Sequence, residues 1–136
     1  MATIASQRHK AACSNRDYDF FYEGLEEARL LIQRCDDCGT LRNPPMPMCP
    51  ACRSVGWTGT PMRGTGTIHS YTVHHHPPLP DFPVPHPVAL IELDEGVRFL
   101  GAMDSTEPED VKIGARVEAE FLRRGDFASL RFRAVP

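Results

Sequence analysis

The sequence predicts a mainly β protein in which a short N-terminal helix and a cysteine-rich metal-binding module precede a small β-barrel. Three observations indicate this fold class. Two C-x-x-C pairs are separated only by residues 39–48. Five segments after residue 63 show the alternation or the β-branched residues of strands, whereas helical periodicity is confined to a short stretch near the N-terminus.

Composition and charge are those of an ordinary globular protein. The 136 residues are 41% hydrophobic and 24% charged, which suits one modest domain with a small attached module. The formal net charge of −3 gives no positive field that would attract nucleic acid or anionic lipid. No apolar run approaches the roughly 18 residues of a membrane span, and Met1–Lys10 lacks the apolar core of a secretory signal. We therefore expect a cytoplasmic protein that binds neither membranes nor nucleic acid.

The N-terminal part is predicted to hold one short helix. Residues 1–16 show no periodic pattern and are expected to form a flexible tail. Asn15 or Asp17 is predicted to cap a helix that runs to about Leu25. Arg29–Arg34 is predicted to be extended and to lead into the first cysteine pair.

The cysteines predict a metal site. A two-residue spacer lets both thiolates of a pair reach one ion, and two such pairs complete a tetrahedron of Cys35, Cys38, Cys49 and Cys52. Four protein ligands leave no position for water, so we expect one structural Zn²⁺ per chain, with iron as the competing metal. The surrounding chain is too polar to fold alone, so metal binding is expected to stabilise it. Cys13 is interpreted as a free thiol in the tail.

The rest of the chain predicts a small barrel. Five strands are expected at 64–76, 88–94, 97–103, 116–122 and 128–134. The segment between the third and fourth strands is polar and is expected to form a loop or a single helical turn. Five strands in this length fit a barrel of the OB type, although an open sheet or an SH3-like barrel would give a similar pattern. The predicted units are thus residues 17–62, with helix and metal module, and residues 63–136.

Two further segments carry interaction hypotheses. Pro77–Pro87 is proline-rich and is predicted to be either a stiff connector or an interaction arm that presents Leu79, Phe82 and Val84. Four arginines gather if the last two strands form a hairpin, and they would make either a solvated barrel edge or a patch for phosphates or an acidic partner. These arginines are Arg123, Arg124, Arg131 and Arg133.

Catalytic motifs are missing from the sequence. It contains no G-x-S-x-G elbow, P-loop or G-x-G-x-x-G motif. His74, His75 and His76 are interpreted as polar residues where a strand leaves the barrel, because further ligands for a second metal cannot be assigned. His69 and His86 likewise have no assignable catalytic partner. The sequence therefore gives no evidence of an autonomous active site.

The order and spacing of seven segments resemble the DUF35 family, in which a rubredoxin-like zinc ribbon precedes an OB-fold domain. The resemblance covers roughly residues 17–134. The segments are Phe20–Leu25, Leu30–Gly39, Pro44–Pro45, Cys49–Cys52, Gly64–Val73, Leu93–Gly96 and Ile113–Glu118.

The resemblance implies a function that the residues alone do not give. Members of this family commonly assist thiolase-superfamily proteins that act on acyl-CoA substrates. The resemblance therefore implies a non-catalytic accessory subunit of a thiolase-like, lipid-transfer-protein-like enzyme, with steroid side-chain retro-aldol cleavage of a CoA thioester favoured over Claisen-type thiolysis or acyl transfer. It transfers the zinc ligands onto the four cysteines and transfers no catalytic residue. The candidate contacts with the partner or with CoA are Phe20, Phe21, Tyr22, Leu79, Phe82, Val84, Arg123 and Arg124.

Two other functions are considered. Zinc ribbons and OB barrels also bind single-stranded nucleic acid, but this chain is acidic and offers only Tyr71, Phe99 and Phe132 as strand aromatics for stacking. The chain could also bind a fatty acyl-CoA without any partner. We rank both below the accessory-subunit hypothesis.

Overall fold

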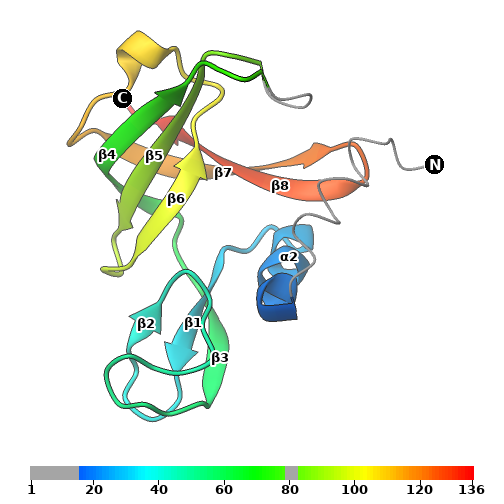
Figure 1. The fold of residues 1–136 in the computed structure, drawn as a ribbon, viewed down its shortest axis with the longest axis vertical. Helices are drawn as coiled ribbons and strands as arrows, with labels where there is room; N and C mark the ends of the chain where they lie inside the picture. The colour runs from blue at the N-terminus through cyan, green and yellow to red at the C-terminus, as the bar shows by residue number, and fades with distance from the viewer. Residues whose placement is uncertain (1–15, 79–82) are drawn as a thin grey trace.

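The computed structural model describes residues 16–78 and 83–136, which form two antiparallel sheets and a short helix beside them (Figure 1). The smaller sheet has the strand order β2-β1-β3 and the larger the order β6-β5-β4-β7-β8. The elements are η1 (Arg16–Tyr18), α2 (Asp19–Glu26), β1 (Leu31–Cys35), β2 (Leu41–Arg42), β3 (Trp57–Pro61), β4 (Thr65–His74), β5 (His86–Leu93), β6 (Arg98–Ala102), η2 (Pro108–Asp110), β7 (Arg116–Arg124) and β8 (Phe127–Ala134).

The predicted helix is confirmed as α2, but Asp17, one of its two predicted caps, does not occupy the N-cap position. The chain already forms the 3₁₀ turn η1 at Asp17, so this residue lacks the extended backbone of a capping residue. Tyr18 takes the N-cap position and makes no side-chain cap hydrogen bond. Asn15, the other predicted cap, lies outside the described residues.

The smaller sheet contains the predicted extended segment as β1, together with two strands that were not predicted. β1 pairs with β2 on one side and with β3 on the other. The sequence signal is weak because β2 has two residues, and β3 contains Gly59 and Pro61, which are depleted in strands.

The five predicted strands of the barrel are confirmed, with ends shifted by at most two residues. β5 begins at His86, before the predicted start, and includes Pro87, whose carbonyl accepts a hydrogen bond from Met103 N (2.9 Å). The predicted single helical turn is η2. The outer strands β6 and β8 pack on each other through Phe99 and Phe132, whose ring centroids are 5.8 Å apart. This packing brings the two edge strands of the sheet together in an OB-like barrel.

One apolar core connects the two sheets. Leu30 lies just before β1, and Ile32 lies in β1 of the smaller sheet, which forms the zinc-ribbon part of the chain and is called the ribbon below. Both join the buried residues of the barrel. A hydrogen bond from Met62 N to the Leu30 carbonyl (2.8 Å) and one from Asn43 Nδ2 to the Arg98 carbonyl (3.0 Å) add polar connections. No helix in the described parts of the chain has the length and apolar character that crossing a membrane requires.

Candidate functional site

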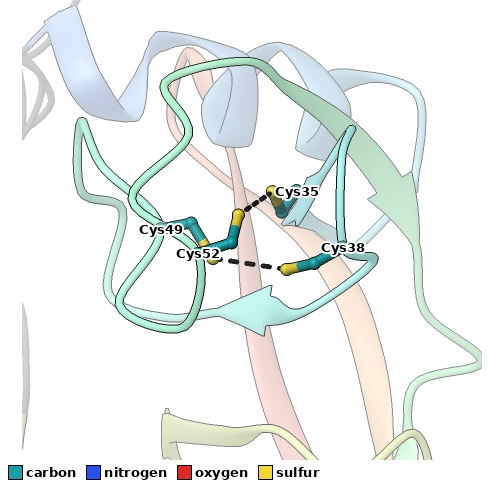
Figure 2. Close-up of side chains that lie close together, drawn as sticks. All are labelled: Cys35, Cys38, Cys49 and Cys52. Atoms are coloured by element: carbon teal, nitrogen blue, oxygen red, sulfur yellow. Dashed lines mark hydrogen bonds between the residues drawn. The ribbon is translucent and has the colours of Figure 1, made fainter.

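The four predicted ligands come together between two loops of the smaller sheet (Figure 2). Cys35 ends β1 and Cys38 follows it, whereas Cys49 and Cys52 lie in the loop between β2 and β3. The Cys35 and Cys52 sulfurs are 3.5 Å apart, and the Cys38 and Cys49 sulfurs are 3.6 Å apart. All four sulfurs lie within 4.8 Å of one another.

These distances fit one tetrahedral metal ion. Zn–S bonds of about 2.3 Å place the sulfurs of a regular tetrahedron roughly 3.8 Å apart. The four thiols are not joined as disulfides. The chain therefore holds four cysteines in position for one metal ion, consistent with structural zinc, and four protein ligands leave no position for substrate or water.

The two cysteine pairs have the same backbone geometry. Cys35 N donates to the Thr40 carbonyl (2.9 Å), and Cys49 N donates to the Ser54 carbonyl (2.9 Å). The residue after the second cysteine of each pair, Gly39 or Arg53, donates its N–H to the first cysteine's carbonyl. Both residues adopt a positive φ, 77° at Gly39 and 66° at Arg53. Arg53 therefore occupies a conformation that favours glycine.

Backbone amides adjust the acidity of the thiols. Hydrogen bonds from the Cys52 and Ala51 backbones to the Cys49 sulfur lower the pKa of Cys49 to about 6, against the opposing effect of burial. The pKa of Cys35 is also lowered, chiefly by the Cys38 backbone. A hydrogen bond from the Ser54 backbone lowers the pKa of Cys52, but the Cys35 thiol and burial outweigh it and raise this pKa to about 12. Amides that stabilise thiolates prepare the loops for a cation.

The aromatic residues of α2 face two different parts of the chain. Phe20 packs on Trp57 of β3, with ring centroids 4.7 Å apart, whereas Phe21 packs on Phe99 of β6 at 5.8 Å. The Phe20 ring thus packs against the ribbon, and α2 contacts both the ribbon and the barrel. Phe21 and Tyr22 line an open depression of about 250 Å³ between α2, β6 and β8.

The structure brings three of the predicted contact residues to this depression. Arg124 joins Phe21 and Tyr22 in its lining, and the neighbouring Leu100 side chain is 63% exposed. Exposed leucine beside half-buried aromatic rings gives an apolar rim with one guanidinium at its edge. Sequence reasoning missed Leu100, whose alternation on β6 could have identified it as outward-facing.

The four arginines of the predicted patch each pair with a carboxylate. Arg123 binds Glu26 (2.9 Å), Arg124 binds Asp104 (2.5 Å) and Arg131 binds Glu120 (2.8 Å). Arg133 pairs with Glu118. These pairs reduce the positive potential that phosphates would meet, so the four residues form a largely neutral edge.

The remaining predicted residues in the described part of the chain do not join the depression or the cysteines. Val84 is exposed, and Leu79, Phe82 and Cys13 lie outside the described residues. His74 Nε2 donates to the Pro77 carbonyl (2.7 Å), while His75 and His76 follow the strand and are exposed.

Two buried polar groups were not expected from the sequence. His86 lies near Asp104, and burial lowers the pKa of His86 against the raising effect of the Asp104 carboxylate. Arg42 is buried in the ribbon beside Gln33. Neither pair has a local sequence signal, because the partners are brought together by strand pairing.

Two family models match the chain. Residues 23–57 match the rubredoxin-like zinc ribbon domain of ChsH2, and residues 59–122 match the C-terminal OB-fold domain of ChsH2. The chain therefore carries a zinc ribbon followed by an OB fold, as predicted.

Three curated proteins and one solved structure are similar to the chain. A probable enoyl-CoA hydratase alpha subunit of Thermomonospora curvata is 45% identical over 79% of this chain, and the 3-oxo-4,17-pregnadiene-20-carboxyl-CoA hydratase alpha subunit of Mycobacterium tuberculosis is 41% identical over 85%. The chain spans only 34% and 37% of these two proteins. A DUF35 domain-containing scaffold protein of Methanocaldococcus jannaschii is 41% identical over 69% of this chain and 68% of its own length. A chain of the Ltp2-ChsH2(DUF35) aldolase superposes with a TM-score of 0.82 and is 42% identical, covering 88% of this chain and 95% of that one.

Proposed function

The chain belongs to the DUF35 family, and from this premise we propose that it is an accessory subunit of a thiolase-like enzyme that cleaves a carbon–carbon bond in a steroid side-chain CoA thioester. In this proposal the chain docks on the catalytic subunit, covers its substrate entrance and supplies no reacting group. The complex would work in the cytoplasm, where the reduced thiols of the ribbon are maintained.

One observation carries the proposal. The match to the Ltp2-ChsH2(DUF35) aldolase extends over 95% of that chain at 42% identity, so it includes both the ribbon and the barrel rather than one common module. The Mycobacterium tuberculosis relative supports the substrate class, because the substrate in its name has a pregnadiene skeleton and a carboxyl-CoA group. The chain covers about a third of that relative, so activity, substrate and partner are all inferred here.

In this proposal, the groups that react with the substrate belong to the partner. In retro-aldol cleavage, a base removes the proton of a hydroxyl group on the carbon β to the thioester. The bond between the α and β carbons then breaks, and its electron pair passes to the α carbon as a thioester enolate, which is protonated. The products are a ketone or aldehyde and a shortened acyl-CoA. The base and the groups that stabilise the enolate are expected on the thiolase-like subunit.

The residues of this chain would contact the partner and shield its active site from water. The depression at Phe21, Tyr22 and Leu100 offers an apolar surface to the partner, and burial of such a rim excludes water from the site behind it. Bound zinc would hold the two cysteine loops together and would take no part in bond cleavage. The described arginines of the predicted patch are paired with carboxylates, so the proposal includes no nucleic-acid role.

Co-expression with a thiolase-like protein encoded nearby tests the proposal. We expect the two chains to co-purify as one species and the complex to convert a β-hydroxylated steroid side-chain CoA thioester into a carbonyl compound and a shorter acyl-CoA. Each chain alone serves as a control and should show little turnover. Turnover that requires added CoA would indicate Claisen-type thiolysis and would overturn the retro-aldol assignment. A chain that binds no such protein would overturn the accessory role.

A further inference from the structure

A buried guanidinium lies inside the ribbon without a carboxylate partner. Arg42 is only 3% exposed, and its Nη1 and Nη2 atoms are enclosed by protein without a hydrogen-bond partner in the described residues. Only Nε is satisfied, because it donates to Gln33 Oε1 and to the Met46 carbonyl, each at 3.1 Å. None of the ion pairs among the described residues includes Arg42.

Such a group needs an explanation, because arginine stays protonated in proteins. Removing an unpaired charge from water is costly, so buried charges are normally paired or lie close to a metal centre. The Gln33 amide is neutral and provides a dipole rather than a charge. A compensating negative charge must therefore lie nearby in the folded, loaded protein.

Strand geometry places Arg42 on the same side of the sheet as the cysteines. Side chains alternate between the two faces of a strand, and Ile32 points into the core shared with the barrel. Gln33 and Cys35 therefore face the other way along β1. Arg42 of β2 pairs directly with Gln33 of β1, so its side chain lies on the same face of the sheet as Cys35. Gln33 and Cys35 are two residues apart, which corresponds to about 7 Å along a strand.

The charge of the cysteine centre has the required sign. A divalent zinc ion held by four thiolates carries two net negative charges. Cys35 and Cys49 are fully buried, so solvent screens this charge incompletely. We propose that Arg42 is the internal counter-charge of the metal centre and that Gln33 positions it there by accepting the Nε hydrogen bond. Gln33 also accepts a hydrogen bond from Met46 N (2.9 Å), which ties the loop leading to Cys49 into the same arrangement.

Zinc affinity of the purified chain, measured by competition with a chromophoric chelator, tests this role. Removing the charge with Arg42→Met should weaken Zn²⁺ binding about 10- to 100-fold, the range typical of residues that tune a metal site. Arg42→Lys retains the charge and should stay closer to wild type than Arg42→Met. Arg34→Met is the matched control, because Arg34 is an exposed arginine on the opposite face of β1. It should bind Zn²⁺ as the wild type does.

A second variant separates charge from scaffolding. Gln33→Glu keeps an acceptor for Arg42 Nε and Met46 N but pairs the guanidinium with a carboxylate. If Arg42 only holds the loop through hydrogen bonds, Gln33→Glu should leave Zn²⁺ affinity unchanged or raise it, and this result would overturn the proposal. A counter-charge role requires weaker Zn²⁺ binding in Gln33→Glu, with an unchanged circular dichroism spectrum of the loaded protein. If Arg42→Met does not fold, Gln33→Glu alone decides the question.

Discussion

The ring of Phe132 in β8 lies directly on Gly101 in β6, so closely that a Cβ atom built at residue 101 would stand 2.4 Å from the ring Cδ2 atom. Phe132 is completely buried, and β6 and β8 are the two outer strands of the larger sheet. The absence of a side chain at residue 101 therefore lets the two ends of the sheet meet and close the barrel.

Substitution of Gly101 should open or strain this closure. We expect Gly101→Ala to lower the free energy of unfolding by about 1–3 kcal/mol, the usual cost of overpacking a core. Chemical denaturation of the zinc-loaded protein measures the effect. Leu100→Ala, on the same strand but exposed, is the control and should change stability little. Equal stability of Gly101→Ala and wild type would show that the strands can separate without cost.

Loss of one ligand should remove the metal. We expect Cys49→Ser to reduce the bound zinc from one ion per chain to nearly none, because Cys49 is fully buried between its partners and three ligands cannot complete the tetrahedron. Native mass spectrometry measures the stoichiometry. Cys13→Ser should keep the ion, since Cys13 is predicted to be a free thiol. Hydrogen exchange should show faster exchange in β1–β3 of Cys49→Ser than in β4–β8.

The two cysteine loops should respond oppositely to glycine and alanine exchanges. Gly39→Ala places a Cβ in a left-handed conformation, and no atom lies within 4 Å of that Cβ, so the cost of about 1 kcal/mol is purely conformational. Arg53→Gly relieves the corresponding strain at φ 66° and should be neutral or stabilising by a few tenths of a kcal/mol. Urea denaturation of the zinc-loaded variants compares them. Destabilisation of Arg53→Gly by as much as Gly39→Ala would contradict the structural equivalence of the two loops.

An ion pair at the base of the barrel should make stability depend on pH. Arg116 donates to both carboxylate oxygens of Asp94 (2.7 and 2.8 Å), and these bonds, with one from Thr65, hold the pKa of Asp94 well below its usual range. A depressed pKa stabilises the fold above the unfolded value of about 3.9 and loses that effect as the pH falls further. Asp94→Asn should therefore be less stable than wild type at pH 7. The difference in thermal midpoint should shrink below about pH 4, whereas a constant difference would contradict this origin.

Local patterns explain why much of the fold could be predicted. Val117 and Phe132 occupy alternating apolar positions and are buried as expected. In a strand with one buried face, apolar and polar residues alternate, so the buried positions can be identified from the sequence. The cysteine spacing likewise determines which thiols can reach one ion. The strand β3 was missed because its pairing with β1, not its own composition, makes it extended.

The surroundings of the candidate sites depend on long-range contacts and could not be predicted. Arg123 and Arg124 attract attention as a basic pair, but Glu26 and Asp104, which pair with them, come from α2 and from the segment after β6. Phe20 and Phe21 are adjacent in sequence yet pack on different sheets. Charge and exposure at these positions become visible only when the tertiary partners are known.

The proposed partner surface can be tested with two equally exposed residues. Leu100 is 63% exposed on the rim of the depression, and Ile113 is 67% exposed in the segment before β7, outside its lining. A charge at either position costs little in the free chain, because both side chains are solvated. If the thiolase-like partner covers the depression, Leu100→Asp buries a carboxylate in an apolar contact and should weaken binding about tenfold or more. Ile113→Asp should bind as the wild type does.

Isothermal titration of the zinc-loaded chain with the purified partner measures both affinities, and circular dichroism verifies that both variants are folded. Equal weakening by the two substitutions would indicate a general effect of negative charge rather than a defined contact. Weakening by Ile113→Asp alone would move the interface to the segment before β7. Selective loss in Leu100→Asp, accompanied by lost turnover of the complex, would place the depression between α2, β6 and β8 at the interface, because the substituted side chain can reach the catalytic subunit only through that surface.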